Sequence, residues 1–217
     1  MSLKKLIYLL SLVSAVFSQN FQVHYEAAES RQYLVSTLEM FQPDEYGSTF
    51  WFADMEYDAA GNKSMSLAYW EIARYVNLPL KNLSATIQFN DGAATFGNLG
   101  QVWLAGLSYY LDLGFFALPV DLLYRHTGGS SSADFQITAA WVQHVMHDKL
   151  EFAGFLDLWS QDGPQDGKQW VLLTEPQLWY LAGDHLSLGS ELEISYNFIF
   201  GETAMQILPT VALRWVF

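Results

Sequence analysis

From residue 19 onward, hydrophobic and polar residues alternate with a period of two, which is typical of β-strands with one apolar face. The clearest run covers residues 186–200, and its opposite face is polar apart from one glycine. The hydrophobic residues on its apolar face are Leu186, Leu188, Leu192, Ile194, Tyr196, Phe198 and Phe200. A run of this length exceeds the usual globular strand of about five or six residues. It suits a tilted strand that crosses a membrane and reaches water at both ends.

The same alternation recurs at residues 48–58 and 133–144, and clusters of proline, glycine, asparagine and aspartate separate such runs. These clusters lie at 27–31, 43–47, 59–63, 77–82, 90–98, 112–114, 127–132, 147–148, 161–168, 182–185 and 201–203. They divide the chain into about twelve strands, the first of them a short one at Phe21–Glu26. The pattern therefore predicts an all-β fold: a transmembrane, antiparallel, up-and-down β-barrel of about twelve strands formed by residues 19–217.

The turns also predict an orientation. With both ends of the barrel domain in the periplasm, the turns at 43–47, 77–82, 112–114, 147–148 and 182–185 face the periplasm. Those at 90–98, 127–132 and 161–168 then face outward, and they are longer and richer in glycine and serine. Short periplasmic turns opposite longer external loops are usual in outer-membrane barrels. Even the outer loops are too brief for a plug or a large lid.

Residues 1–18 have the features of a signal peptide that is cleaved before Gln19. Lys4 and Lys5 precede an apolar stretch at 6–17, and Val16 and Ser18 supply the small residues of a cleavage site. The alternative is an N-terminal membrane anchor, for which the stretch is short. Export of this kind, followed by a barrel, predicts a location in the bacterial outer membrane.

Composition narrows the functional classes. Charged residues make up only 15% of the chain, against about 25% in soluble domains, while aromatic residues reach 16%. The chain has no cysteine, which excludes disulfides, thiolate metal sites and cysteine nucleophiles. Its formal net charge of −13 makes a nucleic-acid partner improbable.

The last strand carries the most specific signal. Ile207, Val211, Leu213, Trp215 and Phe217 share one face. An alternating final strand that ends in an aromatic residue resembles the assembly signal of bacterial outer-membrane proteins, so Phe217 is the predicted assembly signal. The expected partners are outer-membrane lipids and the outer-membrane assembly machinery. A soluble β-sandwich that ends in phenylalanine by chance is the alternative.

Candidate functional residues follow from the cost of charge on the lipid face, about 2–4 kcal/mol for a base near the midplane and less for an acid. Mid-strand charges should therefore point into the lumen. The predicted lumenal acids are Glu39, Asp54, Glu56, Glu71, Asp121, Glu151, Asp157, Glu175, Glu191 and Glu193, with Arg74, Arg125 and Arg214 as the bases. Acids outnumber bases, so the lumen should be negative and should favour neutral or cationic solutes. The alternative is that the bases neutralise these acids locally.

Inward aromatic residues form a second candidate feature, because aromatic faces beside hydrogen-bond acceptors suit a nucleobase and its ribose. They are Phe50, Phe52, Phe155, Trp159 and Trp179. The alternative is that these side chains only fill a narrow barrel.

Several segments resemble a known family. The resemblance is carried by Gln32–Leu34 (QYL), Glu39–Asp44 (EMFQPD), Gly47–Phe52 (GSTFWF), Asp54–Met55 (DM) and Ala68–Ile72 (AYWEI). These look like an uncharacterised family of Bacteroidetes-type outer-membrane proteins that is similar to the nucleoside-specific channel-forming (Tsx-like) family. The resemblance implies a monomeric twelve-stranded barrel that passes nucleosides or similar small polar solutes. No binding residue of that family maps onto this sequence.

Other functions are weaker. Some outer-membrane lipid esterases share a His-x-Ser-Asn-Gly stretch, and residues 124–130 resemble it with Gly128 at the serine position, so Ser130 would have to act with His126 at a different spacing. His144 and His147 lie three apart beside Asp148, which on a strand turns the two rings to opposite sides. We therefore expect no enzyme activity, no cofactor and no metal. A structural or adhesive barrel remains the main alternative to a channel.

Overall fold

The computed structural model describes residues 18–57, 64–114, 116–164 and 167–217. The expected signal peptide and the predicted turn at 59–63 therefore lie almost wholly outside the described residues. In the described chain, no helix is both long enough and apolar enough to cross a membrane. The described elements are β1 (Ser18–Glu26), β2 (Leu34–Asp44), β3 (Gly47–Tyr57), β4 (Met65–Asn77), β5 (Leu83–Ala94), β6 (Gly97–Asn98), β7 (Val102–Asp112), β8 (Ala117–Thr127), β9 (Asp134–Val145), β10 (Leu150–Asp162), β11 (Lys168–Thr174), β12 (Gln177–Leu181), β13 (Leu186–Tyr196) and β14 (Gln206–Val216).

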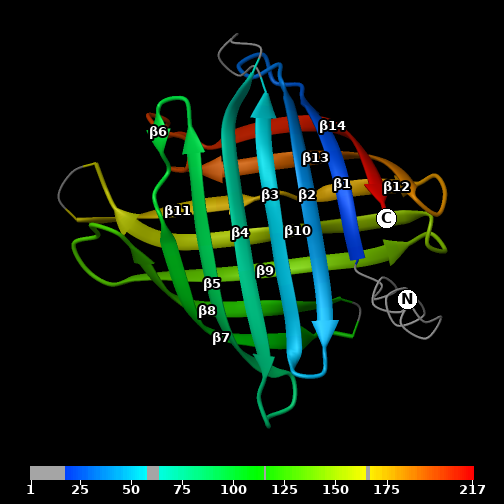
Figure 1. The fold of residues 1–217 in the computed structure, drawn as a ribbon, viewed down its shortest axis with the longest axis horizontal. Coiled ribbons are helices and arrows are strands. Elements are labelled where there is room, and N and C mark those ends of the chain that lie inside the picture. The colour runs from blue at the N-terminus through cyan, green and yellow to red at the C-terminus, as the bar shows by residue number, and fades with distance from the viewer. Residues whose placement is uncertain (1–17, 58–63, 115, 165–166) are drawn as a thin grey trace, which may run out of the picture.

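The strands form one closed antiparallel barrel. Each pairs with its neighbours along the chain, and β1 pairs with β14, which closes the sheet. The two-residue β6 pairs only with β5, and β11 and β12 are successive parts of one strand between β10 and β13. The barrel therefore has twelve strands, as the sequence predicts. Figure 1 shows β2–β5 crossing in front of β9–β13 at a steep angle.

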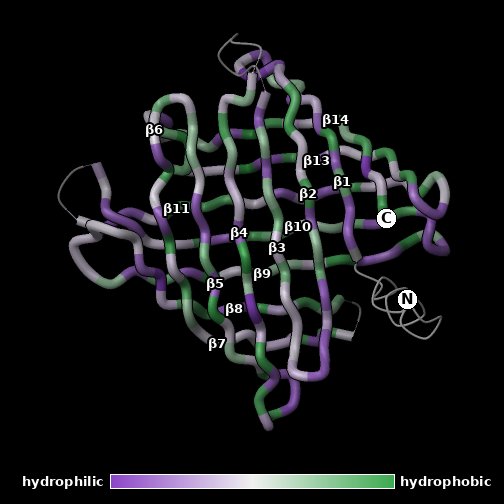
Figure 2. The backbone as a smooth tube through the Cα atoms, in the orientation of Figure 1, coloured by the Kyte–Doolittle hydropathy of each residue, from purple (hydrophilic) through white to green (hydrophobic). Residues whose placement is uncertain are grey.

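Side chains alternate between the inside and the outside of the barrel along each strand. On β1, Gln22 and His24 point inward and are 2% and 3% exposed, whereas Phe21 and Tyr25 point outward and are 39% and 46% exposed. Figure 2 shows the resulting alternation of hydrophobic and hydrophilic positions along the strands. Exposed outward residues of other strands include Trp70, Ile87, Trp103, Leu122, Phe135 and Val211. The apolar face is thus the outer face of the barrel, which is the reverse of a soluble protein.

Two strand boundaries differ from the sequence prediction. β13 ends at Tyr196, so Phe198 and Phe200 lie in the connection to β14 rather than on the strand face. The break follows from Asn197, whose φ of 55° is left-handed and cannot continue a strand. The first strand is longer than predicted, since β1 starts at Ser18 and pairs along its length with β2.

Both ends of the described barrel meet at one end of the molecule, because the backbone N–H of Phe217 donates to the carbonyl oxygen of Gln19 at 3.0 Å. We call this the terminal end and the opposite one the loop end. The connections at the terminal end are 45–46, 78–82, 113–116, 146–149 and 182–185. Those at the loop end, mostly longer, are 27–33, 58–64, 95–101, 128–133, 163–167 and 197–205. The turns predicted to be periplasmic all lie at the terminal end.

Deleting Phe217 should lower the amount of assembled protein in membranes without changing its synthesis. Its side chain is 65% exposed on the barrel surface, where an assembly partner can reach it without unfolding the barrel. The measurement is the fraction of membrane protein whose gel mobility changes on boiling, since a closed barrel resists detergent until it is heated. Phe200→Ala, which removes an aromatic ring that is also exposed, is the control. Equal assembly of the deletion and the parent would contradict the assignment.

Candidate functional site in the lumen

The structure places the predicted site residues of the strands on the inner wall, because residues directly opposite each other on paired strands share a face. In the register, Phe52 lies opposite Glu71, Asp54 opposite Tyr69, and Glu71 opposite Asn90. The predicted site residues on the inner face are Phe50, Phe52, Asp54, Glu56, Glu71, Asp121, Arg125, Phe155, Asp157, Trp159, Glu191 and Glu193. Glu175 lies in the break between β11 and β12, within electrostatic range of Glu191 and Asp54.

Arg74 corrects the prediction that it points inward. It lies opposite Thr49 on the outer face and forms an ion pair with Asp44 at the tip of the β2–β3 hairpin. Hydrogen bonds from the Arg74 guanidinium and from the backbone N–H of Tyr46 lower the pKa of Asp44 to about 2. The rule that charges point inward applies only to mid-strand positions, because an outward charge near a strand end reaches water.

Acidic side chains from opposite walls approach each other in the middle of the lumen. We call Asp54, Glu175 and Glu191 the central acid cluster, since their charges interact across the barrel. Glu191 accepts a hydrogen bond from Gln177 at 2.6 Å, and Nδ1 of His24 lies 3.9 Å from its Oε1. The cluster therefore gathers three carboxylates with neutral donors and one imidazole as neighbours.

A second acidic group lies nearer the loop end. Arg31, in the connection between β1 and β2, contacts Glu26 at 3.1 Å and Glu193 at 2.8 Å. The sequence pattern gives no signal for this role, since Arg31 belongs to no strand. One guanidinium therefore serves two carboxylates, and Glu56 lies within electrostatic range of the same group.

Arg125 marks the opposite side of the lumen. Its guanidinium lies over the ring of Trp159 at 5.1 Å and donates to the side chain of Gln136 at 2.6 Å. Glu71 and Asp157 are within electrostatic range of it. Asp121, lower on β8, accepts hydrogen bonds from Tyr75 and Gln88, each at 2.9 Å.

Trp179 fills part of the lumen toward the terminal end. It is fully buried, its ring lies under the guanidinium of Arg214 at 4.5 Å, and His24 meets its edge at 5.9 Å. The ring rests on Gly189, where an added Cβ would be 2.3 Å from a ring carbon, so only glycine leaves room. Arg214 in turn pairs with Glu151 at 2.6 Å. For Trp179 and the 6%-exposed Trp159, the packing interpretation of lumenal aromatics fits the structure.

The lumen nonetheless reaches solvent at its acids. The side chain of Glu191 keeps 15% of its surface exposed, and that of Glu151 keeps 12%. Phe50, Phe52 and Phe155 are also only partly buried. Since these positions face inward, the exposed surface lies inside the barrel, as expected of a narrow water-filled passage.

Neutral polar residues also line the lumen, and the sequence prediction did not include them. Asn20, Gln22 and His24 follow one another on the inner face of β1 and are buried. Gln22 donates to Asn20 at 2.8 Å, and Asn20 donates to Glu39 at 2.9 Å. The alternation in β1 contained this signal, but the rule used for the sequence selected charges and aromatic rings alone.

The alternative chemistries gain no support from the geometry. The hydroxyl of Ser130 donates to Asp134 at 2.6 Å and lies 3.0 Å from Nζ of Lys168, while His126 points outward opposite Trp103. Ser130 therefore belongs to a polar cluster joining the loop-end connections. His144 lies 3.2 Å from Glu151. Among the described residues, no group of three or more histidine, aspartate or glutamate side chains is arranged to hold a metal ion.

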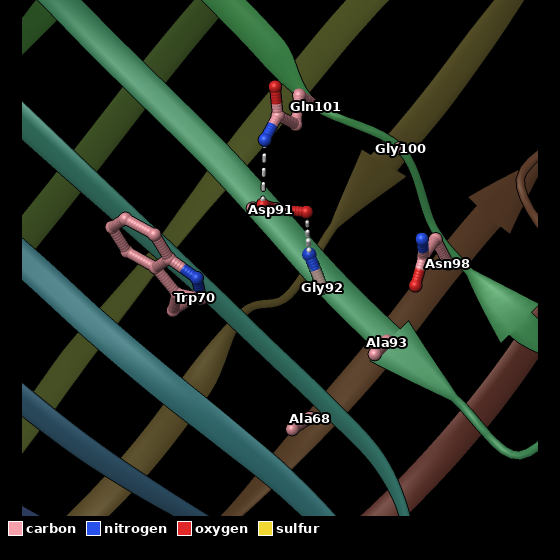
Figure 3. A pocket seen from close by; sticks show the side chains of 8 residues that line it. All are labelled: Ala68, Trp70, Asp91, Gly92, Ala93, Asn98, Gly100 and Gln101. Carbon is pink, nitrogen blue, oxygen red and sulfur yellow. Dashed lines mark hydrogen bonds between the residues drawn. The ribbon is translucent and has the colours of Figure 1, made fainter.

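A groove of about 450 Å³ lies on the outer wall, on β4, β5 and the connection that follows β5 (Figure 3). Its charged residue, Asp91, accepts hydrogen bonds from the side chain of Gln101 at 3.3 Å and the backbone of Gly92 at 2.8 Å. Because Asp91 and Trp70 project from the outer face, this groove is separate from the lumen.

The fold and the polar interior define an outer-membrane-type β-barrel. Among solved structures, the chain is similar to a structure titled "NanC porin", with a TM-score of 0.57 and 11% identity over 92% of this chain and 99% of that one. It is similar to a "KdgM porin" with a TM-score of 0.53 and 7% identity, again over 92% and 99%. A second structure of that porin, titled as a complex with disordered oligogalacturonate, has a TM-score of 0.51 and 10% identity over the same shares.

The sequence itself matches the model of one protein family over residues 18–217. The chain belongs to this family, which is described as a domain of unknown function (DUF5020). None of the curated proteins compared with the chain matches it. At these identities the solved structures establish the barrel fold.

Proposed function

We propose that this protein is an outer-membrane channel for the passive uptake of small polar solutes, with an acidic lumen that favours neutral or cationic ones. The observation that carries the proposal is the central acid cluster: carboxylates from opposite walls face one inner space, and Glu191 keeps solvent-exposed surface there. Structural barrels gain nothing from like charges placed together in a low-dielectric interior, because each raises the cost of the others. A path for solutes accounts for their placement.

The lumenal charge distinguishes this chain from the oligogalacturonate-bound porin of similar fold. Galacturonate carries a carboxylate, and the acids of this lumen would repel it. Nucleosides are candidate solutes, because they are neutral, their hydroxyls donate to carboxylates, and half-buried Phe50 and Phe52 offer aromatic faces beside Asp54. Anionic nucleotides should be excluded.

Liposome swelling with purified protein tests the channel. We expect nucleosides, sugars and zwitterionic amino acids of similar size to produce swelling, and nucleotides to produce much less. Equal rates for neutral and anionic solutes would contradict the acidic lumen. Absence of swelling for every solute would contradict the channel.

A closed structural barrel is the second candidate, and the fully buried Trp179 favours it because an indole ring occupies the interior. The same swelling experiment separates the two functions, since a structural barrel passes none of the solutes. Binding to cells or surfaces without any swelling would support the structural or adhesive function.

A further inference from the structure

Arg125 is a cation without an acidic partner in an interior rich in acids. The ion pairs of the described residues involve Arg31, Arg74, Lys168, Arg214 and two histidines, and none of these pairs includes Arg125. Its Nη1 donates to the neutral side chain of Gln136 at 2.6 Å, and its Nε is buried without any hydrogen-bond partner. A guanidinium has five N–H donors, and a buried one without a counterion is costly. Its surroundings therefore lack an anionic group.

The acids that face Arg125 lack a cation in the same way. Glu71 accepts hydrogen bonds from Asn90 at 2.8 Å and from Tyr69, and Asp157 accepts one from Thr138. All of these donors are neutral, and the charges of Glu71 and Asp157 repel each other. Asn90 is 5% exposed, and its buried Oδ1 has no hydrogen-bond partner. An ammonium group beside Glu71 would find two carboxylates and a free carbonyl oxygen as acceptors.

The two incomplete poles lie in the same part of the lumen. Glu71 and Asp157 are near enough to Arg125 for their charges to interact, yet too far from it for an ion pair of 4 Å. A simple cation would satisfy the acids and be repelled by Arg125, and a simple anion would meet the reverse. A molecule that carries both charges satisfies both poles and adds no net charge.

We propose that this part of the lumen binds a zwitterionic solute of amino-acid size, with its carboxylate on Arg125 and its ammonium group on Glu71 and Asp157. The proposal rests on the channel function, because the solute reaches the site through the lumen. It names the class of solute that the channel selects. The paired gaps in hydrogen bonding at Arg125 and Asn90 are what such a ligand would fill.

Isothermal titration calorimetry of the folded barrel in detergent tests the site with three matched probes at pH 7: alanine, alaninamide and N-acetylalanine. The first carries both charges, the second only the cation and the third only the anion. We expect alanine to bind most tightly and N-acetylalanine not to bind. Arg125→Gln should weaken alanine by about tenfold or more, the usual loss for a hydrogen bond between charged groups, and leave alaninamide unchanged or tighter.

Two further variants make the result specific. Arg125→Lys keeps the charge and should recover part of the affinity for alanine. Arg74→Gln removes the same charge from the outer face and should leave all three affinities unchanged. A boiling-dependent gel shift confirms that each variant is folded. Equal binding of alanine and alaninamide by the parent protein, or unchanged alanine binding in Arg125→Gln, would overturn the proposal.

Transport separates failure of the site from failure of the channel. Glycerol, which carries no charge, should pass through the parent and through Arg125→Gln at the same rate. Uptake of alanine should saturate with concentration in the parent and lose that saturation in Arg125→Gln. Glycerol uptake together with unsaturable alanine uptake in the parent would refute the binding site and leave the channel standing. Alanine binding in calorimetry without any glycerol uptake would support the site and refute the channel.

Discussion

Replacing both Glu191 and Glu193 by lysine is expected to abolish the cation preference of the channel. Both carboxylates point into the same sector of the lumen from β13, and the double change shifts the lumenal charge by four units. In a narrow pore with low-dielectric walls, such a cluster focuses the field and concentrates cations several-fold. Reversal potentials in planar bilayers under a salt gradient measure the preference directly.

The surroundings of each glutamate set the size of this effect. Glu193 already pairs with Arg31, whereas Glu191 is held by neutral Gln177 and faces Asp54 and Glu175. The change at Glu191 should therefore carry most of the loss, and Glu191→Lys alone should come close to the double variant. Glu29→Lys/Glu45→Lys makes the same change in net charge on exposed residues outside the barrel wall and should leave selectivity intact. Anion preference in the parent, or an unchanged preference in the lumenal double variant, would show that these carboxylates do not control permeation.

Replacing Trp179 by alanine is expected to raise single-channel conductance severalfold. The indole ring is fully buried in the lumen between Arg214 and His24, so its removal widens the narrow part of the passage. Gly189 cannot refill the space, since it carries no side chain. Conductance of the purified protein in planar bilayers is the measurement.

The control for this variant lies on the same wall. Trp170 on β11 is 55% exposed on the outer face, so Trp170→Ala removes the same side chain without changing the lumen. It should leave the conductance at the parent value. If Trp179→Ala conducts no better than the parent while both proteins remain folded, the passage is limited elsewhere. Loss of the boiling-dependent gel shift in Trp179→Ala alone would instead assign the ring a structural role.

The sequence by itself determined the barrel and the direction of its side chains. Strand geometry sends successive residues to opposite faces, so the alternation at 186–196 already places Glu191 and Glu193 on the polar wall. Turn residues fixed the strand number, because each hairpin is a local structure. The misplaced residues lie where local rules end: Phe198 beyond the left-handed Asn197, and Arg74 near the rim.

Only the tertiary structure decided which charges meet. Arg31 comes from a connection to bridge Glu26 and Glu193, and Arg214 reaches Glu151 from three strands away. Arg125, which resembles Arg214 in lying over a tryptophan ring, is left without an acid. The reason is physical: closure of the barrel brings together residues that are distant along the chain, and the stagger between strands sets their heights in the lumen. A period of two fixes the face of each residue but not the partner that it meets.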